Sequence, residues 1–251
     1  MEIAKAIVII VAVAVFLVGF AICAFPLIQN IVMDNELKQD VQNFLGRLGT
    51  TSTEDPTILM EQTALPRKYQ LLWDDMVAYN RRLWEEKQSG LRDSWAYQQP
   101  SFTLEDYGLK DEVFGVISIP SLDLEMPLYL GATPAHTAKG AAHLSQTSLP
   151  IGGVNTNCVI AGHRGYWGAD FFRYITDLEP GDKVIITNLW ETMTYTVTET
   201  KIIMPSDVDQ ILIREGRDMI TLLTCHPYAS GGKQRYLVFC DRVVEVASEY
   251  N

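Results

Sequence analysis

Basic residues are scarce in this chain, and cysteines are few. Its 251 residues include 20 Lys and Arg against 31 Asp and Glu, which gives a net charge of −11. This balance argues against nucleic acid as a partner, because phosphate backbones bind basic surfaces. The sequence also contains no internal repeat and no low-complexity tract. With 47% hydrophobic residues, its length suffices for one full domain plus a membrane segment.

The four cysteines form no metal-binding pattern. Neither a CxxC pair nor a Cys/His ligand spacing occurs among Cys23, Cys158, Cys225 and Cys240, so a structural zinc site is not expected. Cys225 and Cys240 would make a poor disulfide, because in a hairpin they lie roughly 17 Å apart along the strands. Cys158 and Cys240 lie in apolar runs and are expected to be small buried residues, with a disulfide between them as the alternative. Cys225 is left as a thiol that needs a function.

A long uncharged run occurs near the N-terminus. Residues 6–28 contain no charged side chain, and as a helix they would reach about 34 Å, enough to cross a bilayer core of about 30 Å. The run is longer than the ~7–15 residues of a signal-peptide core, which favours an uncleaved anchor over a cleaved signal. We therefore expect residues 1–33 to form a single N-terminal membrane pass, with the rest of the chain outside the cytoplasm.

After the anchor, the pattern changes from helical to β-rich. Residues 34–64 are weakly patterned and are predicted to start a helix and continue as a juxtamembrane spacer. Residues 65–110 contain an amphipathic helix over 66–87, because apolar side chains recur there at helical spacing, followed by a loop. Residues 111–251 hold seven or eight short β-rich runs separated by Gly and Pro, which predict a closed barrel or a sandwich.

The last two of these runs bring a cysteine and an arginine together. DMITLLTC ends at Cys225, RYLVFCDR begins at Arg235, and the intervening HPYASGGKQ suits a turn. In such a hairpin the two side chains lie opposite each other, next to the turn. A guanidinium there can stabilise the oxyanion that forms when a thiolate attacks a carbonyl. Taken alone, the pair is better explained as a surface arginine beside an incidental cysteine.

A histidine strengthens the functional interpretation. The run NCVIAGHRG reaches His163 at its end, where loops gather and an acid/base group would be accessible. The other three histidines are weaker candidates. His226 adjoins Cys225 and is expected to point away from it, while His136 and His143 occupy a Gly/Ala/Thr-rich loop and are expected at the surface or behind the site.

These segments resemble the sortase family, and within it the class C, pilin-polymerising sortases. TLLTC matches the family's TLxTC nucleophile motif, VIAGHRG its histidine segment, and QRYLVF the strand that carries its arginine. HLSQTSLPIGG, LEPGDKV and CHPY add to the resemblance, which covers about residues 66–246. It implies a mostly β fold: an eight-stranded sortase-type β-barrel with N-terminal helices and a lid loop, preceded by one transmembrane helix.

The resemblance also implies roles for individual residues. Cys225 would be the nucleophile, His163 the acid/base, and Arg235 the group that stabilises the oxyanion or positions the substrate. Thr224 and Tyr228, which flank the nucleophile, are predicted substrate contacts. No metal or other cofactor is required by this chemistry.

Class C sortases carry a lid before the barrel, with an Asp-Pro-aromatic tripeptide in the active cleft. The corresponding stretch here is RDSWAYQ, with Asp93 and Trp95 in matching positions and Ser94 in place of the proline. We expect Asp93 to pair with Arg235 and Trp95 to cover Cys225. The alternative is an aromatic loop that only packs on the barrel.

The activity implied is that of a cysteine transpeptidase. It would cleave an LPxTG-like sorting signal between Thr and Gly and join the Thr carbonyl to a lysine amine of a pilin subunit, at the cell membrane of a Gram-positive bacterium. A wall-anchoring sortase, another extracytoplasmic cysteine peptidase and a non-catalytic pilus-assembly adaptor remain as alternatives. Many class C members end in a second membrane helix, whereas VVEVASEYN holds no such run; either the protein has a single anchor or the sequence is truncated.

Overall fold

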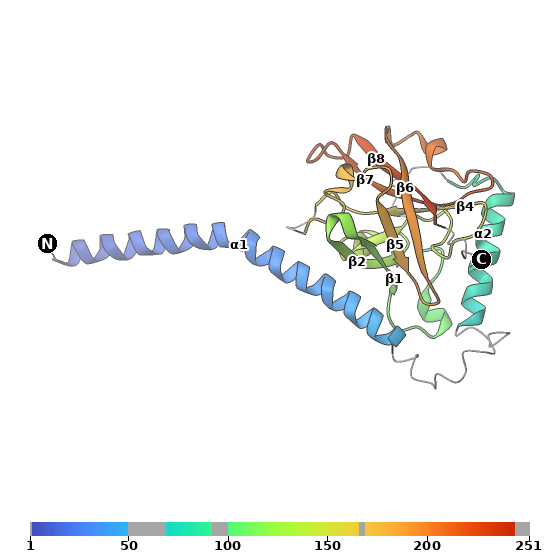
Figure 1. The fold of residues 1–251 in the computed structure, drawn as a ribbon. Helices are drawn as coiled ribbons and strands as arrows, with labels where there is room; N and C mark the ends of the chain where they lie inside the picture. Colours follow the sequence, from blue (N-terminus) through green and yellow to red (C-terminus); the bar gives the residue numbers. More distant parts are fainter. Residues whose placement is uncertain (1, 50–68, 92–99, 166–168, 244–251) are drawn as a thin grey trace, which may run out of the picture.

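A closed barrel of eight strands forms the centre of the molecule (Figure 1). The computed structural model describes residues 2–49, 69–91, 100–165 and 169–243. Around the barrel the strands follow the order β1-β2-β3-β4-β7-β8-β6-β5. Their bounds are β1 Val113–Ile119, β2 Leu124–Leu130, β3 Ala141–His143, β4 Thr156–Ala161, β5 Lys183–Thr187, β6 Thr192–Ile203, β7 Asp218–His226 and β8 Gln234–Arg242. The predicted eight-stranded barrel is confirmed.

Two of the strand pairs are parallel. β2 pairs with β3, and β4 pairs with β7, in the same direction, whereas the other neighbours are antiparallel. The β4–β7 pairing matters for function, because it places the C-terminal ends of two strands distant in sequence side by side. β3 was predicted as loop. Its three residues, Ala-Ala-His, carry no β-branched or aromatic-rich pattern and are held in the sheet by pairing on both edges.

Strand residues alternate between two hydrophobic clusters. Side chains from all eight strands fill the barrel interior; in β7 and β8 these include Ile220, Leu222 and Cys240. The intervening residues, such as Leu223 and Leu237, face outward into a second cluster on the outside of the wall. Cys158 and Cys240 are free thiols buried in the interior, as predicted for small buried residues.

Helix α1 (Glu2–Gly49) is longer than the predicted anchor. Its first part exposes apolar side chains as far as Val32, and it is the one described helix that is long and apolar enough to cross a membrane. Figure 1 shows that α1 bends between its apolar first part and its second part, which runs along the barrel. Leu37, Val41 and Phe44 of this second part are buried against the barrel. The helix predicted to start within residues 34–64 therefore continues α1 as far as Gly49, and its apolar face packs on the barrel wall; residues 50–64 lie outside the described residues.

Helix α2 (Gln70–Glu85) is the predicted amphipathic helix. Its buried face consists of Leu72, Met76, Tyr79, Asn80 and Leu83. These side chains join a third hydrophobic cluster against strands β1 and β2, so the expected helical spacing is confirmed. Short helical segments complete the fold: η2 Leu104–Tyr107, η3 Pro120–Leu122, α3 Pro134–Thr137, η4 Ile175–Asp177 and η5 Val208–Ile211.

Candidate active site

The predicted nucleophile and arginine face each other across two antiparallel strands. In the β7–β8 ladder Cys225 is the direct partner of Arg235, so both side chains project to the same side of the wall. Leu223 and Leu237, two residues further into the strands, belong to the outer cluster. The pair therefore lies on the outer face of the barrel, at the end of the two strands, as the hairpin prediction required.

His163 reaches the same place through the parallel pairing of β4 with β7. Ala161 pairs with Leu223, and the Gly162 amide continues the ladder by donating to the Leu223 carbonyl at 3.1 Å. His163 follows two residues after Ala161, and Cys225 lies two residues after Leu223 in β7, so the two residues lie at neighbouring positions along the wall. The registers thus place Cys225 opposite Arg235 and bring the end of β4, which His163 follows, beside the same strand end.

Gly162 lets the Phe172 ring pack closely against the backbone just before His163. A Cβ at this position would lie 2.6 Å from the Phe172 ring, so only glycine fits without a shift of that ring. The Phe172 amide donates to the His163 carbonyl at 2.9 Å. The His163 backbone is therefore fixed between the strand end and the following loop, while its half-buried side chain remains near solvent.

The loop between β7 and β8 closes over the thiol through Gly232. An added Cβ there would lie 3.3 Å from the Cys225 Sγ and 3.2 Å from the Arg235 Nη1, and the residue has a left-handed φ of +75°. Its carbonyl also accepts a hydrogen bond from Arg235 Nη1 at 2.5 Å, and the Gln234 carbonyl accepts a second at 3.1 Å. The loop backbone therefore orients the buried guanidinium beside the thiol.

Burial places both titratable groups in their neutral forms near neutral pH. Burial lowers the pKa of His163 and raises the pKa of the Cys225 thiol. The positive charges of Arg235 and, to a smaller extent, Arg164 lower the thiol pKa and offset part of this rise. A neutral imidazole can accept a proton and a neutral thiol can give one up. The resting site is thus set for proton transfer from sulfur to imidazole as the nucleophile attacks.

Arg164 is a second cation at the thiol that sequence reasoning did not assign. Its Nη1 donates to the Nδ1 of His226 at 2.7 Å and to the Cys225 carbonyl at 3.5 Å. His226 also packs against the Tyr236 ring at 5.8 Å, so it lies on the other face from Cys225, as predicted. The only signal for Arg164 was its position directly after His163.

We expect Arg164→Ala to slow alkylation of Cys225 at neutral pH several-fold. Losing a cation that lowers the thiol pKa reduces the thiolate fraction, and the midpoint of the alkylation profile moves to higher pH. Iodoacetamide rates measured between pH 6 and 10 in a Cys23→Ser background test this expectation. Arg81→Ala, which removes an exposed cation of α2, should leave the profile unchanged. Identical profiles for the wild type and Arg164→Ala would contradict the assignment.

The remaining predicted residues differ in their placement. Thr224 is fully buried and its hydroxyl donates to the Gly162 carbonyl at 2.8 Å, so it ties β7 to β4, and its contact with substrate stays a prediction. Tyr228 is 52% exposed on the loop after the thiol. Asp93 and Trp95 lie outside the described residues.

One histidine prediction needs correction. His143, expected at the surface or behind the site, is fully buried in β3, and its Nε2 lies 3.1 Å from the Thr147 carbonyl. Desolvation lowers its pKa to about 4. His136 is half-buried and its Nδ1 contacts the Gly131 carbonyl at 2.8 Å. Within the described ranges no group of three or more His, Cys, Asp or Glu residues is arranged to hold a metal ion.

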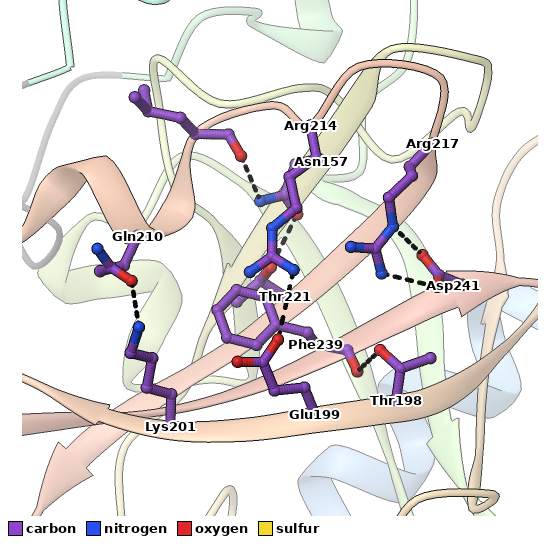
Figure 2. Close-up of polar contacts among 11 residues, drawn as sticks. Asn157, Thr198, Glu199, Lys201, Gln210, Arg214, Arg217, Thr221, Phe239 and Asp241 are labelled. Carbon is purple, nitrogen blue, oxygen red and sulfur yellow. Dashed lines mark hydrogen bonds and ion pairs between the residues drawn. The ribbon is translucent and has the colours of Figure 1, made fainter.

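The connection between β6 and β7 covers the outer face next to the site (Figure 2). Asn157 of β4 donates to the Ile211 carbonyl at 3.0 Å and accepts from the Thr221 hydroxyl at 2.8 Å. The Arg214 guanidinium lies 4.4 Å from the centre of the Phe239 ring. These contacts hold the connection against β4, β7 and β8. The strand ends that carry the thiol and the imidazole remain partly exposed beyond it.

Comparison with known proteins identifies relatives of this fold and motif set. A family model described as "Sortase domain" matches residues 117–243. Sortase D of Bacillus subtilis is 28% identical over 131 residues, which cover 51% of this chain and 63% of that protein. Sortase A of Bacillus anthracis is 33% identical over 134 residues, which cover 53% of this chain and 61% of that protein. The chain thus spans less than two thirds of the length of these two relatives.

Solved structures extend the similarity beyond the barrel. Sortase C1 of GBS Pilus Island 1 superimposes with a TM-score of 0.68 at 25% identity, covering 83% of this chain and 99% of that one. A sortase C of Streptococcus pneumoniae gives a TM-score of 0.67 at 29% identity, covering 81% of this chain and 96% of that one.

Proposed function

The chain belongs to the sortase family, and we propose that it is a class C-type cysteine transpeptidase that links pilin subunits outside the cytoplasm. The observation that supports the proposal is the register of the strands: the β7–β8 ladder pairs Cys225 with Arg235, and the β4–β7 ladder brings the end of β4, just before His163, to the same end of the barrel. Solved neighbours named for pilus sortases support the choice of substrate.

The proposed reaction begins with attack by the Cys225 sulfur on the Thr carbonyl of an LPxTG-like signal. His163 accepts the thiol proton as the S–C bond forms, and Arg235 donates hydrogen bonds to the oxyanion. When the Thr–Gly bond breaks, His163 returns that proton to the departing glycine amine. The product is a thioester between the enzyme and the shortened pilin.

A lysine amine of a second pilin then attacks the thioester. The imidazole takes a proton from the attacking nitrogen, the C–S bond breaks, and the proton passes to the sulfur, which restores the neutral pair. The result is an isopeptide bond and a free enzyme, with no net oxidation and no cofactor. Because His163 and Cys225 are only partly exposed, the site limits the access of water, which competes with the amine for the thioester.

We further propose that residues 6–28 anchor the protein in the cell membrane, with the barrel outside the cytoplasm. The exposed apolar side chains along the first part of α1 support this proposal. A lid formed by Asp93 and Trp95 stays a prediction from the family resemblance.

Product analysis tests the function. The full chain in detergent is incubated with a pilin that bears an LPxTG-like signal and an acceptor lysine, and ladders that resist SDS are the expected product. A pilin in which that lysine is replaced by arginine is the matched control and should give no ladder. Cleavage without any ladder would instead indicate a peptidase, and the absence of both would indicate a non-catalytic adaptor.

A further inference from the structure

The barrel has two ends, and the registers assign the beginning and the end of each strand to one of them. Arg235 pairs with Cys225 and also with Ile203, while Ala161 pairs with Leu223 on one side and Ala142 on the other. Continuing around the sheet, the beginning of β2 and the end of β1 fall at this same end. We call it the thiol end; the turn containing η3, between β1 and β2, lies here with the loop between β7 and β8.

Helix α1 meets the thiol end first on its way from the apolar run. Met33 and Leu37 pack into the interior cluster that includes Leu122 and Leu124 of the turn between β1 and β2. Further along, Arg47 forms an ion pair with Asp111 at 3.1 Å, just before β1 begins at the opposite end of the barrel. The helix therefore runs from the thiol end to the far end.

The distance between the apolar run and the barrel is short. Met33 lies five positions after Ile28, the end of the proposed membrane segment, and at ~1.5 Å per residue this step spans about 8 Å. A headgroup layer extends about 5–8 Å beyond each side of the bilayer core. The first contact between helix and barrel thus falls at the outer edge of the headgroups, with continuous helix rather than a flexible linker between them.

The exposed surface of the thiol end suits that position. Tyr174 is 44% exposed and Tyr228 is 52% exposed, and the Arg173 guanidinium lies 5.5 Å and 4.8 Å from the centres of their rings. Tyrosine and arginine side chains combine an apolar body with a polar tip and are favoured at the level of lipid headgroups. In Figure 1 the first part of α1 and the loop between β7 and β8 extend toward the same side of the barrel, while α2 lies on the opposite side.

We propose that the thiol end of the barrel lies against the bilayer surface, held there by the rigid passage of α1 from the membrane onto the barrel wall, with lipid headgroups as the partner of Tyr174, Arg173 and Tyr228. This orientation rests on the proposed membrane anchoring by residues 6–28 and is independent of the proposed chemistry.

The test measures the depth of two positions in the full chain reconstituted in phosphatidylcholine vesicles. In a Cys23→Ser, Cys225→Ala background, a single cysteine is introduced by Tyr228→Cys at the thiol end or by Val154→Cys, an exposed position before β4 at the far end. Each is labelled with a fluorophore, and lipids with a nitroxide on the headgroup serve as quencher. We expect at least threefold stronger quenching at position 228 than at position 154.

Flotation of the same vesicles separates the two proposals. Protein that floats with the vesicles and stays in the vesicle fraction after alkaline carbonate extraction confirms anchoring. If anchoring is confirmed, equal quenching at both positions, or stronger quenching at position 154, overturns the orientation alone. Protein that does not float overturns the anchor and the orientation with it. Insertion of a flexible six-residue Gly-Ser segment after Asn30 should make the quenching at positions 228 and 154 similar, because the helix would no longer fix the orientation of the barrel relative to the membrane.

Discussion

Replacement of Cys225 by alanine will abolish both the acyl-enzyme and the pilin ladder, with a loss of at least about 10³-fold in rate. The thioester needs the sulfur as its covalent partner, and no other described thiol reaches the site: Cys158 and Cys240 are buried in the barrel interior, and Cys23 lies in the apolar part of α1. Ladder formation followed by SDS gel and acyl-enzyme formation followed by intact mass measure the two losses.

The matched controls are Cys158→Ala and Cys240→Ala. Each removes a thiol of the same size from the interior, so each should leave activity within a few-fold. Residual ladders from Cys225→Ala at the rate of these controls would exclude Cys225 as the nucleophile.

Arg235→Lys should lower kcat about 100-fold, equivalent to about 2.7 kcal/mol of transition-state stabilisation, while the protein keeps its fold. In the native site the Gly232 and Gln234 carbonyls hold the Nη1 nitrogen of the guanidinium, and the planar fork offers donors in fixed directions that can be used toward a substrate oxygen. An ammonium has no such fork, so it cannot be held by the loop and present directed donors in the same arrangement. Steady-state cleavage of a fluorogenic signal peptide measures the effect, with the melting temperature as a check of folding.

Arg217→Lys provides a control matched in chemistry. Arg217 binds Asp241 through two hydrogen bonds of 2.9 and 2.7 Å at the far end of β8 (Figure 2), so its replacement breaks a forked pair without touching the site. It should change stability and leave kcat near normal. Normal turnover in Arg235→Lys would reduce Arg235 to a general electrostatic role.

The local part of the site could be predicted from the sequence, because a hairpin is encoded in consecutive residues. The turn chemistry between Cys225 and Arg235 and the apolar runs on both sides set their register. The placement of His163 depends on the parallel β4–β7 pairing, which joins segments distant in the chain and has no local signal. The sequence pattern placed His163 at a strand end, and the family motif gave its role beside Cys225 and Arg235.

Other features depend on contacts that form only in the folded chain. Arg164 was missed because its role arises from contacts with His226 and Cys225 across two elements. The packing of residues 34–49 on the barrel was not predicted, because the apolar face formed by Leu37, Val41 and Phe44 is recognisable only once the barrel wall that covers it is known. β3 was missed because its pairing, rather than its composition, makes it a strand.

The measurement that tests the central claim most directly is tandem mass spectrometry of the acyl-enzyme. The full chain is mixed with a synthetic LPxTG-like peptide in the absence of an amine acceptor, quenched in acid and digested. The account predicts one adduct, the peptide truncated after Thr and joined as a thioester to Cys225, and its disappearance when a lysine-containing acceptor is added before the quench. Cleavage of the peptide without an adduct on Cys225, or an adduct that an amine cannot discharge, would contradict it.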